Sequence, residues 1–135
     1  MNDKFDSNIF GDLFSSIHEK QKPYVDIIET ERLILKKEKT PDFVSTIYSI
    51  LLRKNEEKIG EVNLIYDGEI WYKIDKSFRK NGYATEAVSK LIDISKREDF
   101  FLSIKIMNIA SRKVAKKLGF KLKRITGGKM IFRKE

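Results

Sequence analysis

The spacing of apolar residues changes along the chain and predicts where helices give way to strands. The first residues place apolar side chains at helical intervals, which predicts a short amphipathic helix with the apolar face Ile9, Phe10, Leu13, Phe14 and Ile17. Composition shifts near residues 21–23, so we divide the chain into an N-terminal amphipathic segment, 1–28, and a domain, 29–135. We expect the segment to pack on the domain or across a homodimer, since either arrangement would bury its apolar face.

Alternating and β-branched apolar residues predict a run of strands after this boundary. The stretch TERLILKK (30–37) alternates, and the stretches STIYSILLRK (45–54) and KIGEVNLIYD (58–67) are rich in Ile, Val and Tyr. The polar residues NEEK separate the last two stretches, which predicts a hairpin, and GEIWYKID (68–75) continues the antiparallel meander.

Helical spacing returns near Ala84. Apolar residues from there to Ile92 fall at i, i+3 and i+4 positions and predict a helix. Glu86 and Lys90 should face outward on this helix as an i, i+4 ion pair, so we interpret Glu86 as structural.

The end of the chain predicts a strand, a helix and a hairpin. DFFLSIKIM (99–107) is short and apolar and suits a buried strand. A second helix is expected over residues 110–118, stopped by Gly119, and the remainder predicts a hairpin around residues 127–128. Helix, four strands, helix, strand, helix and hairpin make a mixed α+β sheet protein.

Charge and cysteine content narrow the functional classes. The chain has 28 Lys and Arg against 20 Asp and Glu, a formal charge of +8, which favours a polyanionic partner such as nucleic acid, the ribosome or a phosphorylated cofactor. The absence of cysteine argues against disulfides and thiolate-bound metal, and we expect a cytoplasmic location. No signal-peptide pattern opens the sequence and no apolar run could span a bilayer, so no membrane partner is expected.

The stretch SFRKNGYATEAVSKL (77–91) predicts an anion site. It places Arg79, Lys80 and Gly82 directly before a helix, where free backbone N–H groups and the positive end of the helix dipole converge. Gly82 could adopt a positive φ and would let a phosphate approach without a Cβ, and the small Ala84 keeps the first turn open. Pyrophosphate is the occupant that this pattern favours.

Three blocks resemble the GCN5-related N-acetyltransferases (GNAT superfamily). RKNGYATEA (79–87) resembles the Arg/Gln-x-x-Gly-x-Gly/Ala signature, and NIASRKVAKKLGF (108–120) is similar to the Asn-x-x-Ser helix that ends in Leu-Gly-Phe. ETERLILKK (29–37) resembles the first strand of the branch that includes the ribosomal-protein N-terminal acetyltransferases. The resemblance implies a central, mostly antiparallel, twisted sheet flanked by helices, and an acetyl-CoA-dependent N-acetyltransferase.

The resemblance also implies a cofactor site. Acetyl-CoA, as cosubstrate, would lie with its pyrophosphate on the amides of residues 79–84 and its pantetheine arm on strand 71–75, where a strand N–H polarises the thioester carbonyl. Ser111 could orient the cofactor or return a proton to the thiolate, which makes it the candidate catalytic residue. The expected cofactor-binding residues are Tyr72, Lys73, Ile74, Asp75, Arg79, Lys80, Asn81, Gly82, Tyr83, Ala84, Thr85, Asn108 and Ser111.

Two departures from the family pattern affect the expected chemistry. Ala115 stands where many members carry a tyrosine general acid, and residues 38–44 are too few for the two helices that normally build the acceptor wall. The resemblance implies that the acceptor is a primary amine of a small molecule or a protein N-terminus, and that this amine attacks acetyl-CoA directly, without a metal. Glu61 and Glu69 are alternative general bases, and the sequence does not choose between them.

Several residues have a plainer interpretation, and two other functions stay open. We expect His18 and the basic helix face at 112–117 to be solvated surface, and Trp71 and Tyr72 to line the core and cleft. A catalytically degenerate acyl-CoA sensor or subunit is the main alternative. A nucleic-acid-binding module is a weaker alternative, because the strands offer no aromatic stacking signature.

Overall fold

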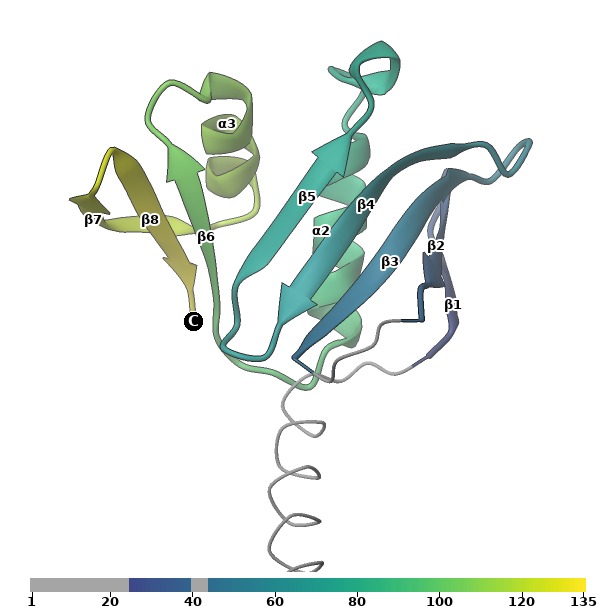
Figure 1. Cartoon of the computed structure of the whole chain (residues 1–135), viewed down its shortest axis with the longest axis horizontal. Coiled ribbons are helices and arrows are strands. Elements are labelled where there is room, and N and C mark those ends of the chain that lie inside the picture. Colours follow the sequence, from purple (N-terminus) through teal and green to yellow (C-terminus); the bar gives the residue numbers. More distant parts are fainter. Residues whose placement is uncertain (1–24, 40–43) are drawn as a thin grey trace, which may run out of the picture.

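Two antiparallel sheets form the framework of the protein (Figure 1). The computed structural model describes residues 25–39 and 44–135, so the predicted N-terminal helix and His18 lie outside the described residues. The larger sheet is built in chain order from β1 (Ile27–Glu29), β2 (Leu33–Lys37), β3 (Ser45–Leu52), β4 (Lys58–Ile65) and β5 (Ile70–Ile74). The smaller sheet has the order β6 (Phe100–Lys105), β8 (Lys129–Lys134), β7 (Lys121–Thr126).

The helices follow the ends of strands. A 3-10 turn, η1 (Lys76–Phe78), continues β5 and leads into α2 (Tyr83–Ile94), and α3 (Ile109–Lys117) connects β6 to β7. The predicted meander, both helices and the terminal hairpin are confirmed, as is the mixed α+β class. The sequence missed β1, which has only three residues and pairs antiparallel with β2.

The core lies between the larger sheet and α2. Alternate residues of β3 and β4 turn toward this face and are buried, because the side chains of a strand point to opposite faces in turn. α2 buries Ala87, Val88 and Leu91 against them. Tyr48 is fully buried in β3, and burial, together with nearby Asp26, raises the pKa of its phenol to about 12.

The two sheets meet at one point and then part. Glu69 and Phe101 form a single parallel bridge, and the Phe101 N–H donates to the Gly68 carbonyl at 3.0 Å. Beyond this bridge, β5 pairs only with β4 and β6 pairs only with β8 among the described strands. Figure 1 shows β5 and β6 running in the same direction away from this junction. Along the edge of β5 that faces β6, the backbone N–H and C=O groups beyond the bridge therefore take no part in the strand pairing of either sheet.

The connection between β2 and β3 is short. β2 ends at Lys37 and β3 begins at Ser45, so the span in between lacks room for the two helices that the family pattern places there. Within the described part of the chain, neither α2 nor α3 is long and apolar enough to cross a membrane.

Candidate functional site

The stretch singled out in the sequence forms a turn that leads into the N-terminus of α2. Gly82 is the N-cap residue and has φ +80°, a left-handed conformation that glycine adopts without strain. No side chain caps this end of the helix, so its first N–H groups have no intrahelical partner and point out of it. The expectation of a positive φ at Gly82 is confirmed.

Hydrogen bonds within the turn hold its shape. The Arg79 Nε donates to the Ile74 carbonyl at 2.8 Å, and the Asn81 side-chain amide donates to the Phe78 and Arg79 carbonyls at 3.1 and 3.2 Å. Lys80 has φ +66°, so two left-handed residues, Lys80 and Gly82, are separated by Asn81 alone. Alternation of this kind turns successive N–H groups toward a common point and makes an anion-binding concavity.

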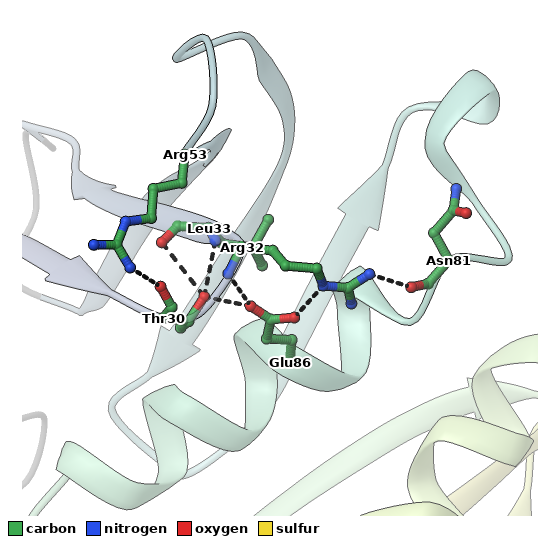
Figure 2. A network of polar contacts seen from close by, with 6 residues as sticks. All are labelled: Thr30, Arg32, Leu33, Arg53, Asn81 and Glu86. Atoms are coloured by element: carbon green, nitrogen blue, oxygen red, sulfur yellow. Dashed lines mark hydrogen bonds and ion pairs between the residues drawn. The ribbon is translucent and has the colours of Figure 1, made fainter.

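Arg32 joins this turn to the start of the larger sheet (Figure 2). Its Nη1 donates to the Asn81 carbonyl at 2.9 Å, and its guanidinium lies 4.4 Å from the centre of the Tyr83 ring. A Cβ built on Gly82 would lie 3.5 Å from Arg32 Nη2. A second positive charge therefore stands beside the helix N-terminus, contributed by a residue 49 positions before Asn81.

Glu86 holds Arg32 in this position. Its Oε1 accepts from Arg32 Nε at 2.7 Å, and its Oε2 accepts from the Arg32 backbone N–H at 2.9 Å and from the Thr30 hydroxyl. Figure 2 shows the carboxylate between the Thr30–Arg32 turn and the guanidinium. The prediction that Glu86 faces outward toward Lys90 is wrong, because its side chain is only 20% exposed and contacts the β1–β2 connection. Its structural role stands, but its partner is Arg32.

The surroundings of Glu86 favour its ionised form. Burial alone would raise the pKa of the carboxyl, but hydrogen bonds from Thr30 and Arg32, together with the Arg32 charge, outweigh burial and lower the pKa below its ordinary value. Stabilisation by this group is fully present above the pKa it has in the unfolded chain, and is lost as pH falls through the lower folded-state pKa.

We therefore expect Glu86→Gln to lower the free energy of unfolding by about 1–2 kcal/mol near neutral pH, because charge-assisted hydrogen bonds are lost. The difference between parent and variant should shrink once the pH falls below about 4, where carboxylates become protonated. Urea unfolding near pH 7 and near pH 3 measures both differences. A difference that is equal at the two pH values contradicts the role given to the carboxylate charge.

The edge of β5 that faces β6 presents backbone groups at every second residue. The Asp75 N–H donates to Ile59, and the Glu69 carbonyl accepts from Ile65, so odd-numbered residues turn their backbone groups toward β4. Even-numbered residues turn theirs the other way, because the direction alternates along a strand. The N–H groups of Tyr72 and Ile74 thus face the region where β5 and β6 part, next to the turn before α2.

Tyr72 and Ser111 connect the two sides of this region. The Tyr72 hydroxyl donates to Ser111 Oγ at 2.9 Å, which links β5 to the first turn of α3. Burial raises the pKa of the Tyr72 phenol, and the bond to Ser111 offsets this only in part. Since Ser111 Oγ accepts this bond, its own hydrogen remains available to donate. Ala115, one turn further along α3, is fully buried and contributes no polar group.

The remaining expected site residues take different positions. Lys73 and Asp75 are exposed, and Tyr83, Ala84 and Thr85 form the half-buried first turn of α2. Asn108 caps α3, since its Oδ1 accepts from the Ser111 N–H at 3.1 Å. The expected residues of β5, the turn and the start of α2 thus follow one another around one region, and Ser111 of α3 contacts it through its bond to Tyr72.

The two candidate bases differ in setting. Glu61 lies on β4 and pairs with Lys58 at 3.1 Å. Glu69 lies where the sheets meet, and burial, reinforced by Asp67, raises the pKa of its carboxyl despite an opposing effect of Lys129. Trp71, expected with Tyr72 to line the core and cleft, is not part of the core, because it lies on the face of β5 away from the buried Ile70 and Ile74 and is 40% exposed. That it lines the cleft stays a prediction.

Two strands that diverge from a single bridge, followed by an uncapped helix N-terminus, define a protein of the acyl-CoA N-acyltransferase fold class. A family model described as an acetyltransferase (GNAT) domain matches residues 15–121. The chain therefore belongs to the GNAT acetyltransferase family. No curated protein sequence matches it significantly.

Solved structures with the same fold include acetyltransferases of ribosomal proteins. An acetyltransferase from Agrobacterium tumefaciens has a TM-score of 0.72 and 17% identity, over 84% of this chain and 96% of that one. The ribosomal L7/L12 α-N-protein acetyltransferase RimL, solved with coenzyme A, has a TM-score of 0.67 and 14% identity, over 80% of this chain and 97% of that one. The ribosomal-protein-S5-alanine acetyltransferase from Vibrio fischeri has a TM-score of 0.63 and 13% identity, over 80% of this chain and 95% of that one. These similarities support the expected resemblance to the ribosomal-protein branch.

Proposed function

We propose that the protein is an N-acetyltransferase that transfers acetyl from acetyl-CoA to a primary amine by direct attack. The observation that carries this proposal is the uncapped N-terminus of α2 at Gly82, beside the free edge of β5, in a chain of the GNAT family. Acetyl-CoA would supply the activated acetyl thioester. Coenzyme A in the RimL structure supports this choice of cosubstrate.

The residues present fit a phosphorylated cosubstrate. Apart from its chain neighbours, only Arg32 Nη2 lies within 4 Å of a Cβ built on Gly82 among the described residues, so a negatively charged group can approach both the backbone and the guanidinium. Backbone N–H groups from Arg79 to Ala84 would bind the pyrophosphate. The N–H groups of Tyr72 and Ile74 would pair with the pantetheine arm, and one of them would polarise the thioester carbonyl.

Ser111 is the proposed proton donor. As the amine nitrogen forms its bond to the acetyl carbon, the carbon–sulfur bond breaks and the electron pair goes to sulfur. Ser111 Oγ–H would protonate that sulfur. The Tyr72 hydroxyl, already bonded to Ser111, would return a proton to Ser111 Oγ and take one from water, so that both side chains end neutral. This route replaces the tyrosine that many family members carry at the position of Ala115.

The face of β5 that lies away from α2 is the proposed approach for the amine. Glu69 and Trp71 both lie on this face, because residues two apart on a strand share a face. The neighbouring Asn63 of β4 is buried, pairs in register with Trp71, and has an Oδ1 without a hydrogen-bond partner in the structure. A raised pKa suits Glu69 for accepting a proton from an ammonium group, so we prefer it to Glu61 as the general base.

The proposal is tested by ligand-dependent stability and by CoA release. Acetyl-CoA, but not free acetate, should raise the melting temperature, because a ligand that binds only the folded state stabilises it. Mixing the acetyl-CoA complex with a panel of amines and of peptides with free N-termini should release CoA for at least one class. No melting shift with acetyl-CoA would contradict the cofactor assignment.

The second candidate function is a GNAT-fold subunit that binds acyl-CoA without catalysis. Two observations favour it: the buried Ala115 at the family's tyrosine position, and the short connection over residues 38–44 on the acceptor side. Acetyl-CoA would then raise the melting temperature, yet none of the amines would release CoA.

Ser111→Ala is expected to lower kcat about 100-fold with little change in KM for acetyl-CoA, since a proton donor acts mainly in the transition state. Tyr72→Phe keeps the ring but removes the hydroxyl, so it should lower kcat by less and should leave acetyl-CoA affinity unchanged. Steady-state kinetics and isothermal titration separate the two effects. A raised KM at unchanged kcat in Ser111→Ala would instead identify Ser111 as a binding residue.

A further inference from the structure

Positive charge is concentrated in the last part of the chain. Residues 105–135, which we call the basic arm, contain eleven Lys and Arg but only one acidic side chain, Glu135. The whole chain has 28 basic and 20 acidic residues. Residues 1–104 therefore contain 17 basic and 19 acidic residues and are nearly neutral. The net charge of +8 therefore originates entirely in the basic arm.

The structure leaves eight of these eleven cations exposed, and Arg112, Arg133 and Lys134 are half-buried. The basic arm comprises the last residue of β6, α3, β7 and β8, which lie together at one side of the molecule (Figure 1). Every residue of β7 is exposed, including Lys121, Lys123 and Arg124. All the ion pairs found in the described part of the chain involve residues before position 100, so no cation of the arm is held in an ion pair there, although the charge of Lys129 acts on the Glu69 carboxyl. Like charges gathered without counter-charges repel one another and destabilise the folded state.

β7 is the outer edge of the smaller sheet, and this position distinguishes between partners. The strand order β6-β8-β7 places it two strands away from β6, which borders the cofactor region. Lysines on an exposed edge strand oppose the addition of another strand, so an extended peptide is disfavoured there. A nucleic-acid backbone requires no strand pairing, and its phosphates need only accessible cations.

We propose that the basic arm binds the phosphate backbone of nucleic acid, with β7 as part of the contact surface. This inference is independent of acetyl transfer. The binding would be electrostatic and weakly dependent on sequence, because the arm offers cations but none of its residues is aromatic apart from the buried Phe120 and Phe132. Absence of a stacking signature thus argues against base-specific recognition but leaves backbone binding open.

The test uses the full chain and fluorescently labelled oligonucleotides, one of single-stranded RNA and one of duplex DNA. Anisotropy titrations between about 50 and 200 mM salt give the affinity and its salt dependence. The variant Lys121→Gln/Lys123→Gln/Arg124→Gln should bind at least one of the two about tenfold more weakly at the lowest salt. Its slope of log affinity against log salt should fall by about 2 to 3, as three phosphate contacts are lost.

A matched control removes the same charge elsewhere. Lys36, Lys54 and Lys96 are exposed and lie outside the basic arm, so replacing all three by Gln should leave the affinity and the slope within about twofold of the parent. Saturating acetyl-CoA should not displace the oligonucleotide, and the β7 variant should keep its melting shift with acetyl-CoA. These last two measurements separate failure of this proposal from failure of the proposed acetyltransferase function.

Three results would overturn the proposal. The first is equal weakening by the β7 variant and the control, which would indicate a general charge effect. The second is displacement of the oligonucleotide by acetyl-CoA, which would place it in the cofactor region. The third is binding of polyglutamate at least as tight as that of both oligonucleotides at equal salt, which would indicate an acidic protein as the partner.

Discussion

Gly82→Asp should weaken binding of acetyl-CoA by about a hundredfold while the protein stays folded. The new Cβ would lie 3.5 Å from Arg32 Nη2, so there is room for the side chain, but its carboxylate would occupy the anion site and engage the guanidinium. Loss of two charge-assisted hydrogen bonds corresponds to roughly 3 kcal/mol, or about a hundredfold in affinity. Because φ at this position is +80°, the substitution also costs about 1 kcal/mol of stability.

Gly82→Asn is the matched control, since it has the same size and backbone strain without the charge. Its stability should equal that of Gly82→Asp, while its acetyl-CoA affinity should fall by only about tenfold. Isothermal titration gives the affinities, and circular dichroism verifies the fold. If the folded Gly82→Asp protein binds acetyl-CoA as tightly as the parent, the turn before α2 is not the phosphate site.

Gly60→Ala should destabilise the protein by about 3 kcal/mol, which corresponds to a fall of roughly 10 °C in melting temperature. A Cβ at Gly60 would lie 2.1 Å from the Lys73 carbonyl oxygen of the neighbouring strand. That oxygen belongs to the backbone and cannot rotate away, so β4 and β5 must separate. Since Tyr72 and Ile74 flank Lys73, acetyl-CoA binding should weaken as well.

Gly127→Ala is a suitable comparison for Gly60→Ala. Gly127 has φ +57°, and a Cβ there would meet no atom within 4 Å, so the substitution introduces backbone strain without a steric clash. We expect it to cost only about 1 kcal/mol and to leave acetyl-CoA affinity unchanged. Thermal unfolding of the two variants distinguishes the effects, and equal losses of stability would contradict the close approach at Gly60.

Local patterns in the sequence predicted most of the fold. The helix expected from Ala84 begins at Tyr83, and the helix expected over residues 110–118 spans Ile109–Lys117. The spacing of apolar residues and the residue types found in turns are local properties. The strands, the hairpins and the positive φ of Gly82 could therefore all be predicted from nearby residues.

Contacts between distant residues could not be predicted in this way. Arg32 was seen only as part of a strand-like block, because nothing in its neighbourhood indicates a partner 54 positions away at Glu86. The bond from Tyr72 to Ser111 spans 39 positions, and it depends on how β5 and α3 lie across the divergence of the sheets. The exposure of Trp71 could not be predicted either, because strand alternation alone does not tell which face of a sheet is covered.

The link between Glu86 and the Thr30–Arg32 turn has a consequence for the order of folding. The turn before α2 and the start of α2 can form from local interactions. Arg32 takes its place beside them only after the Thr30–Arg32 turn has met Glu86, more than 50 residues further along the chain. Contacts of such long sequence separation form slowly, because the entropy of closing the loop is lost before they contribute. The anion site should therefore mature late, so acetyl-CoA binding during refolding would report completion of the native structure and not the appearance of α2.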